Sequence, residues 1–417
     1  MAQIPRDSAP DSTLALLTDG YDFISKRAQR YGTDVFATRL FLRDAYCVTG
    51  PEAAEVFYTP DRFTRNGALP QTTLRLLQDK GSVAVLDDGA HRLRKQMFMS
   101  MMTPERVTDL VDLAVDEWQV RMPLWQRMER VVLLDAVREI LTRAASRWSG
   151  IPPLSARDGA ERTRELAAMI EGAGSIGPRN WRGQLLRERT ERWCREIIHQ
   201  VRNGDLKAPE ESAAHVIAWH RDEQDRLLDP KIASVELLNI IRPTVAVSRF
   251  VVFSALALHE HPEIRTALTS GDDGAYERFV QEVRRFYPFF PFVGGRALEE
   301  FTWRDNQFEE GTWFLLDLYG TNHDPAVWDK PNTFDPEHFR HWDGSPYNFI
   351  PQGGGDFVMG HRCAGEWITI QVLKALARQL VTAMEYDVPP QDLQVRLSSM
   401  PAIPKSGFVM TNIRPAA

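Results

Sequence analysis

A permanent cation and a helix-breaking residue stand side by side in an otherwise apolar stretch of the chain. Arg242 and Pro243 belong to the run NIIRPTVAVSRFVVF, inside a predicted long helix between Pro230 and Pro262. Proline has no backbone N–H and its ring crowds the carbonyl four residues earlier, so we expect a kink that costs about 3 kcal/mol. A guanidinium stays charged and needs an anion when it is buried. The pair therefore marks a special position in the helix.

The predicted helix offers Arg242 no anion, because no Asp or Glu occurs between Glu236 and Glu260. Arg242 therefore extends to the surface, pairs with a carboxylate from another segment, or binds the carboxylate of a substrate. The sequence alone leaves these alternatives open. Arg249 follows seven residues later on nearly the same helical face, and we interpret it as structural.

A single cysteine follows a glycine-rich loop near the C-terminus. The run FIPQGGGDFVMGHRCAGEWITIQVLKAL places Cys363 just before a predicted helix that begins near Glu366. Glycines let the backbone approach a ligand closely, and the positive end of a helix dipole lowers the pKa of a nearby thiol. A thiolate ligand suits this position, and a buried structural cysteine is the alternative. No Gly-Lys-Ser/Thr follows the glycines, as a phosphate loop requires, and His361 has no second Cys/His pair for zinc.

The composition is typical of a globular protein and argues against nucleic-acid binding. The 417 residues carry a formal net charge of −7, whereas non-specific binding to nucleic acid needs a concentrated basic surface. The N-terminus lacks the apolar core of a signal peptide and no stretch reads as a transmembrane segment, so we expect a cytoplasmic protein. Cys47, Cys194 and Cys363 are too few for a disulfide framework, which agrees with that location.

Hydrophobic periodicity predicts a mainly α protein with minor β. Apolar residues recur at spacings of three and four in the runs 106–122, 188–202, 231–241, 276–287 and 367–384. Short strand-like runs occur at 35–50, 130–135, 313–319 and 406–414. No long Gly/Ser-rich or Pro-rich linker divides the chain, so we expect residues 1–417 to form one domain.

Three features follow one another in an unusual order. Glu282 and Arg285 lie three apart in a predicted helix, the aromatic-rich run WDKPNTFDPEHF comes next, and the glycine-rich loop with Cys363 follows. This order resembles the cytochrome P-450 superfamily, over essentially the whole chain. The resemblance implies a single triangular, mainly helical domain that binds haem b, with Cys363 as the axial ligand of the haem iron. It also implies that Glu282 and Arg285 tie their helix to the aromatic-rich run.

The resemblance further implies basic residues that face the haem propionates. The candidates are Arg65 in FTRNGALP and the basic residues of HRLRKQMF. A helix spreads the latter around its circumference, so only some of them can point toward the haem. We favour His91 and Lys95, which lie four residues apart on one face.

The segment around Arg242 is similar to that of one bacterial branch, the fatty-acid peroxygenases. Its members share RPTVA, QEVRRFYPFFP, LDLYGTNHD, IPQGGG and GHRC with this chain, where ordinary members carry an acid followed by Thr in place of Arg242 and Pro243. The resemblance implies that Arg242 binds the carboxylate of a long-chain fatty acid. We expect the kink at Pro243 to let the helix lean toward the haem. The bound carboxylate would act as acid–base catalyst, so hydrogen peroxide would serve as oxidant without an obligatory redox partner.

The same resemblance implies which part of the substrate reacts. Phe289, Phe290, Phe292 and Val293 are expected to line the path of the acyl chain, although an aromatic cluster is more often plain core. Anchoring by the carboxylate predicts oxidation at the alpha or beta carbon and mainly a 2-hydroxy fatty acid. The alternatives are 3-hydroxylation, decarboxylation to a terminal alkene, a conventional monooxygenase served by redox partners, and a non-catalytic haem-thiolate ligand sensor.

Three positions depart from the pattern of this branch. Ala84, in GSVAVLDDGAHR, stands where relatives carry Gln or His above the haem, and this position is associated with product outcome. Ala364 stands where relatives commonly carry Pro, which adds a backbone N–H near the sulfur. His338 stands where Arg is usual, so the ion pair of Glu282 is expected to weaken or to involve Arg340.

Overall fold

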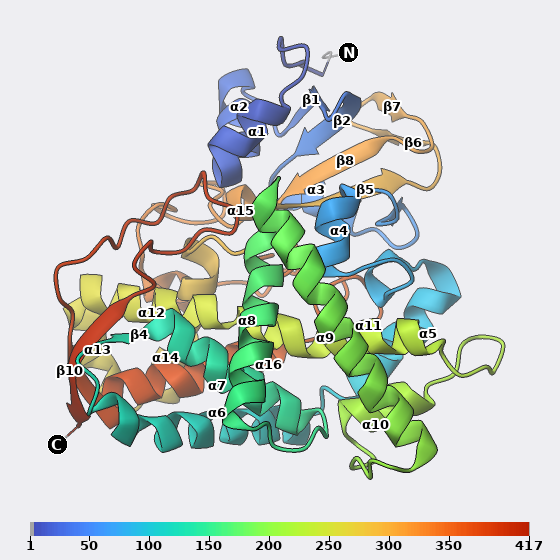
Figure 1. Cartoon of the computed structure of the whole chain (residues 1–417). Coiled ribbons are helices and arrows are strands. Elements are labelled where there is room, and N and C mark those ends of the chain that lie inside the picture. Colours follow the sequence, from blue (N-terminus) through green and yellow to red (C-terminus); the bar gives the residue numbers. More distant parts are fainter. Residues whose placement is uncertain (1–3, 417) are drawn as a thin grey trace.

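The computed structural model describes residues 4–416 and is mainly helical, with small sheets (Figure 1). The α-helices are α1 Thr13–Asp19, α2 Phe23–Tyr31, α3 Pro51–Phe57, α4 Gln71–Leu77, α5 Asp88–Ser100, α6 Pro104–Trp125, α7 Leu133–Trp148, α8 Ala156–Gly172, α9 Pro178–Asn203, α10 Ala213–Trp219, α11 Pro230–Ala246, α12 Ser248–Glu260, α13 Pro262–Leu268, α14 Asp273–Phe286, α15 Leu318–Thr321 and α16 Glu366–Arg378. Short 3-10 helices are η1 Gly20–Asp22, η2 Val83–Val85 and η3 Pro336–Arg340, and the π-helix η4 Gln379–Ala383 continues α16. The predicted class, mainly α with minor β, is confirmed.

The strands form three small sheets. They are β1 Val35–Leu40, β2 Arg43–Val48, β3 Phe63–Thr64, β4 Val131–Val132, β5 Phe292–Ala297, β6 Phe301–Trp303, β7 Asn306–Phe308, β8 Trp313–Asp317, β9 Met384–Asp387 and β10 Val409–Pro415. The strand orders are β1-β2-β8-β5-β3, β4-β10-β9 and β6-β7. The strand-like run 35–50 forms two antiparallel strands, β1 and β2. A strand over 130–135 is wrong beyond Val132, because Leu133 already begins the amphipathic helix α7.

The helices α11 and α12 form the centre of the molecule. Figure 1 shows them crossing behind α8 and α9, while the five-stranded sheet lies at one end. Within residues 4–416, the stretch 230–260 is the one that is long and apolar enough to cross a membrane, and 89% of its most apolar window is buried inside the protein. Packing within the protein therefore accounts for the apolar character of this stretch.

The regular hydrogen bonding of the central helix is interrupted one turn after Pro243. The helix α11 continues through Pro243 to Ala246, and the interruption falls at Val247, whose N–H bonds to Thr244 O at 3.2 Å instead of continuing the regular ladder. Proline removes only its own N–H, so the turns on either side retain their bonds and the surrounding core holds them in place. The helix α12 therefore starts about one turn after Pro243.

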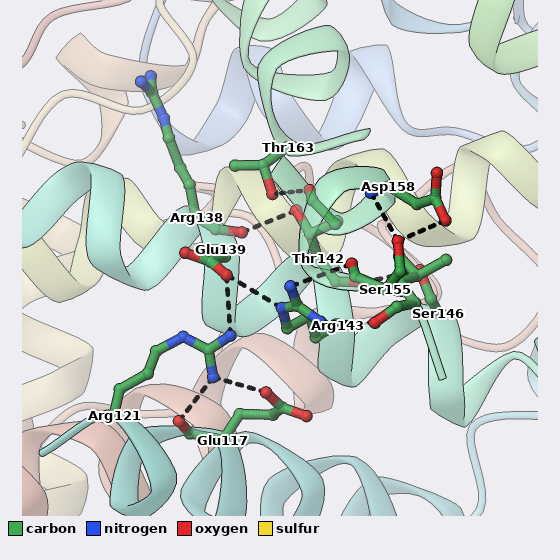
Figure 2. A network of polar contacts seen from close by, with 12 residues as sticks. Glu117, Arg121, Arg138, Glu139, Thr142, Arg143, Ser146, Ser155, Asp158 and Thr163 are labelled. Carbon is green, nitrogen blue, oxygen red and sulfur yellow. Dashed lines mark hydrogen bonds and ion pairs between the residues drawn. The ribbon is translucent and has the colours of Figure 1, made fainter. Parts of the chain in front are cut away.

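A polar network joins α6, α7 and α8 at one side of this core. Figure 2 shows Arg121 of α6 between two carboxylates, with Nη1 2.6 Å from Glu117 Oε2 and Nη2 3.0 Å from Glu139 Oε1. Arg143 of α7 also donates to Glu139, at 3.0 Å, and Ser155 caps the N-terminus of α8. These contacts fix α6 against α7 where their apolar faces meet the core.

The helix α14 is tied to the segment that follows β8. Arg285 Nη2 lies 2.7 Å from Glu282 Oε1, and both side chains are fully buried. Arg285 also donates to the carbonyl oxygens of Asn322, Pro331 and Thr333. This arrangement matches the structural role expected for the pair, because one guanidinium binds three backbone carbonyls of the segment 322–333.

The departure at His338 is accommodated without Arg340. His338 Nδ1 lies 3.2 Å from Glu282 Oε1, and this contact raises the pKa of His338. Arg340 pairs with Glu337 at the surface, so the expectation that Arg340 takes over the ion pair is wrong. His338 thus contacts Glu282 directly, as the longer Arg side chain usual at this position would.

Candidate functional site

Cys363 lies where the glycine-rich loop meets the first turn of α16. Its N–H bonds to Gln352 O at 3.2 Å, which closes the loop on itself. The side chain of Gln352 turns toward the same point, with Nε2 3.7 Å from Cys363 Sγ and 3.0 Å from Thr369 Oγ1. Gly353 has a φ of +94°, a conformation that favours glycine, so the glycine is needed for the turn. The loop therefore presents one sulfur with few protein contacts.

Burial raises the pKa of Cys363, and the charge of Glu366 adds to this effect. The N–H of Gly365 and the charges of Lys95 and Arg284 act in the opposite direction but do not outweigh it. Without a ligand on the sulfur, desolvation is therefore the larger contribution to the pKa of this thiol. A metal cation bound to the sulfur would remove the proton outright.

A buried ion-pair network that the sequence did not predict supports the loop. Arg284 of α14 pairs with Glu366 at the start of α16, and Arg284 Nη2 lies 3.2 Å from Gln352 Oε1. Glu366 also accepts from Arg362 Nε at 2.6 Å. Arg284 precedes Arg285 in the same EVRR motif, so this helix holds the downstream segment with one arginine and the cysteine loop with the other.

Three predicted basic residues gather near Cys363 without carboxylate partners. Lys95 Nζ donates to Arg362 O, and Arg65 Nη1 donates to Gly294 O at 2.9 Å. Burial lowers the pKa of Lys95 to about 8 and also lowers that of Arg65. These cations meet neutral backbone oxygens, so each would gain free energy from an anionic ligand.

His91 belongs to the same group of basic residues. Its ring stacks on the ring of His361 with 3.9 Å between centroids, and burial lowers the pKa of His91 to about 4 and that of His361 to about 2. Arg65 and Lys95 contribute to both shifts. The positive potential at this position therefore comes from side chains of three separate segments.

The other two basic residues of α5 point elsewhere. Arg94 Nη1 lies 2.6 Å from Glu236 Oε1, and Arg92 Nη1 lies 3.7 Å from Asp61 Oδ1 at the surface. The structure thus separates His91 and Lys95 from their neighbours, as the helical spacing predicted.

These residues fit a haem group. Within residues 4–416 no cluster of three or more His, Cys, Asp or Glu residues could hold a metal ion by itself, so a metal at Cys363 has to bring its other ligands with it. A macrocycle with acidic side groups meets this need and supplies the anions that Arg65, His91 and Lys95 lack. Cys363 would ligate the iron, and the cations of Arg65 and Lys95, with the neutral ring of His91, would hold the propionates.

Arg242 is a buried cation without a carboxylate partner. It is 5% exposed, which rules out that it extends to the surface, and its hydrogen bond runs from Nη1 to Leu76 O at 3.0 Å. Burial lowers the pKa of Arg242 to about 9, and no acidic group counteracts this shift. The other two guanidinium nitrogens, Nε and Nη2, make no hydrogen bond with the described residues and are not completely buried. This edge of the guanidinium therefore keeps accessible surface.

A second buried arginine, which the sequence did not single out, lies close to Arg242. Arg187 of α9 is fully buried, and its charge contributes to the lowered pKa of Arg242. Its nearest acidic atoms are Asp79 Oδ2 at 3.5 Å and Glu191 Oε2 at 3.6 Å, and its three guanidinium nitrogens have no hydrogen bond. The two arginines make this interior region electropositive.

The residues expected to line the acyl chain are not all brought together. Phe289 stacks on Phe250 of α12 at 4.2 Å, next to the core helix that carries Arg242. Phe290 is 39% exposed, and Phe292 packs against the core beneath β1 and β2. Val293 is half-buried on β5. Ala84 lies half-buried in η2, one residue after a contact between Val83 N and Glu236.

Arg249 is buried on α12 and lies near Tyr21. Burial lowers the pKa of Arg249 to about 10, and the hydroxyl of Tyr21 donates to Phe289 O at 2.9 Å. Its position in the core, beside Tyr21, fits the structural interpretation.

Comparison with known proteins places these features in context. The family model Cytochrome P450 matches residues 276–412. The structure of cytochrome P450SP alpha (CYP152B1) in complex with (R)-ibuprophen is 48% identical with a TM-score of 0.95, over 97% of this chain and 99% of that chain. Cytochrome P450EX alpha (CYP152N1) with myristic acid is 41% identical with a TM-score of 0.96, over 100% of both chains. A variant of cytochrome P450 OleT in complex with arachidonic acid is 35% identical with a TM-score of 0.96, over 100% of this chain and 99% of that chain.

Proposed function

Because the chain belongs to the CYP152 family of cytochromes P450, we propose that it oxidises long-chain fatty acids with hydrogen peroxide, mainly at the alpha carbon. The observation that carries this proposal is the buried Arg242, which has no carboxylate partner among residues 4–416. The three similar structures described above were each determined with a carboxylic acid, which agrees with an anionic substrate.

The fatty-acid carboxylate binds the free edge of Arg242. Nη1 is engaged by Leu76 O, so Nε and Nη2 remain for a paired interaction with two carboxylate oxygens. A planar guanidinium fork suits such a pair better than an ammonium group. The positive charge of Arg187 favours the anion further. Substrate binding therefore removes the unfavourable state of a buried cation without an anion.

The overall reaction replaces one C–H bond of the substrate by C–OH. A fatty acid and hydrogen peroxide give a 2-hydroxy fatty acid and water, so the peroxide is reduced and the carbon oxidised without any further electron donor. When bound through Cys363, haem b supplies the redox-active iron, and thiolate ligation favours O–O cleavage. Ordinary members of the superfamily have an acid and Thr at this point of the helix, whereas this chain has Arg242 and Pro243. The substrate carboxylate held by Arg242 therefore takes the place of the acid and accepts and returns the peroxide proton.

The anchor decides which carbon reacts. A carboxylate fixed at Arg242 keeps the first carbons of the chain at the reacting centre and directs the tail away, toward the aromatic side chains around Phe289. Ala84 favours a mixture of products. Its methyl group offers no polar contact to the reacting carbons at a position where relatives carry Gln or His. We therefore propose the 2-hydroxy acid as main product, with 3-hydroxy acid and terminal alkene as side products.

The test uses purified holoprotein, myristic acid and hydrogen peroxide without reductase or NAD(P)H. The proposal predicts 2-hydroxymyristic acid as the main product and little reaction with myristyl alcohol or methyl myristate, which carry no anion for Arg242. A protein that needs a reductase and dioxygen would be a conventional monooxygenase. One that binds myristic acid and never oxidises it would be a ligand sensor.

A further inference from the structure

The last turn of α4 and the loop that follows it lie against α11 and are bonded to it at several points. Leu76 O accepts from Arg242 Nη1 at 3.0 Å, and Gln78 O accepts from Asn239 Nδ2 at 3.4 Å. A Cβ at Gly81 would lie 2.5 Å from a side-chain carbon of Ile232, so only glycine lets the loop follow the helix this closely.

Glu236 makes the last of these bonds. Glu236 Oε1 accepts from Val83 N at 2.8 Å and from Arg94 Nη1 at 2.6 Å, while Oε2 accepts from Asn239 Nδ2 at 3.1 Å. Residues 236, 239 and 242 follow at intervals of three, so their side chains lie on one face of α11. Glu236 is fully buried, and Arg94 supplies the charge that a buried carboxylate needs.

These contacts connect the proposed anchor with the proposed pocket wall. Arg242 holds the last turn of α4 through Nη1 and offers its other edge, Nε and Nη2, to the substrate carboxylate. Glu236 holds the end of the loop after α4 through Val83, whose next residue is Ala84. The bond from Glu236 to Val83 thus fixes the segment with Ala84 against the same helix that carries Arg242.

We propose that Glu236 is a positioning residue that fixes the segment 83–85 relative to Arg242 and thereby sets which carbon of the bound fatty acid is oxidised. This inference rests on the proposed function and deepens it. Glu236 touches neither substrate nor haem and acts through the backbone of Val83. A displacement of about 1 Å at a reacting centre can change a rate by about 100-fold, so a loose segment alters the ratio of alpha to beta oxidation.

Two substitutions remove this bond from opposite sides. Glu236→Leu removes the acceptor, and Val83→Pro removes the donor while it leaves the pair of Glu236 with Arg94 intact. Proline is compatible with the first position of a 3-10 helix, and Ser82 before it is extended with ψ of 160°. Each variant is expected to change the ratio of 2-hydroxy to 3-hydroxy myristic acid about tenfold, and Glu236→Leu is expected to speed hydrogen exchange at the amide of Val83.

Two controls separate positioning from general destabilisation. Arg94→Met breaks the ion pair but keeps the bond to Val83, so it lowers the unfolding temperature and leaves the product ratio near that of the wild type. Lys231→Ala, at the exposed start of α11, changes neither quantity. If Glu236→Leu does not fold, Val83→Pro decides the question.

The outcomes distinguish this inference from the function on which it rests. An active wild type whose product ratio is unchanged in Val83→Pro contradicts the positioning role of Glu236 alone. An equal change of ratio in Arg94→Met also contradicts it, because the effect would then come from the ion pair. A wild type that does not oxidise fatty acids with peroxide contradicts both statements.

Discussion

Arg187 and Arg242 are buried guanidinium groups on two packed helices, α9 and α11, and the charge of Arg187 lowers the pKa of Arg242. Two like charges in a dry region repel each other, and an anion bound at Arg242 relieves this repulsion. An anionic ligand therefore stabilises this pair of arginines more than it would stabilise a single buried arginine.

Removing Arg187 therefore weakens the affinity for fatty acids. We expect Arg187→Met to raise the Kd for myristic acid about fivefold, which corresponds to about 1 kcal/mol. Binding is measured by displacement of a fluorescent fatty acid at several salt concentrations. Arg192→Met, an exposed position on the same helix, serves as control and should bind as the wild type does. Equal or tighter binding by Arg187→Met would show that this charge does not act on the ligand.

Cys363 is expected to be the ligand of the haem iron. The reduced, carbon monoxide-saturated protein should show the red-shifted Soret band of thiolate ligation, and Cys363→Ala should lose it. Cys194→Ala, which removes a cysteine buried in the core, should keep the band. A thiolate spectrum in Cys363→Ala would mean that another residue binds the iron.

Glu282 stabilises the fold through Arg285. Glu282→Gln leaves a fully buried guanidinium without its anion, so we expect the free energy of unfolding to fall by about 3–5 kcal/mol in urea titrations. Glu337→Gln removes the partner of the exposed Arg340 and should cost less than about 1 kcal/mol. Similar small losses in both variants would be inconsistent with a supporting role of the buried pair.

The sequence predicted those parts of the site that local spacing defines. Cys363 in its loop, the pair Glu282 and Arg285 three residues apart, and His91 and Lys95 on one helical turn all depend on neighbours in the chain. The isolation of Arg242 was predictable too, because its helix contains no acidic residue near it. These features require no knowledge of how distant segments pack.

The parts that sequence reasoning missed depend on contacts between distant segments. Arg284 reaches Gln352 and Glu366 across more than 60 residues, and Glu236 reaches Val83 across 153. Charged residues within apolar helices indicate that buried ion pairs exist, but the sequence alone does not identify the partner of each residue. The break at Val247 was misplaced for a related reason, since packing of the core, and not the proline alone, decides where a helix yields.

Asp317 should make stability depend on pH. Burial raises the pKa of Asp317 to about 7 from 3.8, so the folded protein holds this proton where the unfolded chain has lost it. The resulting stability is complete below pH 4 and is lost as the pH rises toward 7, by about 4 kcal/mol at most. Asp317→Asn can keep the contacts to Ser25 and Gly320 without a charge, so the difference between variant and wild type should grow with pH.

The comparison is made by thermal unfolding at intervals between pH 5 and pH 8. The unfolding temperature of Asp317→Asn should rise relative to that of the wild type as the pH increases. Parallel curves would indicate that Asp317 titrates normally in the folded protein.

The most direct test of the account is the position and rate of oxidation of myristic acid by peroxide in the wild type and in Arg242→Leu. We predict 2-hydroxymyristic acid from the wild type and a loss of about 100-fold in Arg242→Leu, the size expected when one partner of a buried charge pair is removed. Arg242→Lys should fall between them, because it keeps the charge and loses the fork. Oxidation by Arg242→Leu at the wild-type rate, or hydroxylation of the wild-type product far along the acyl chain, would contradict the carboxylate anchor.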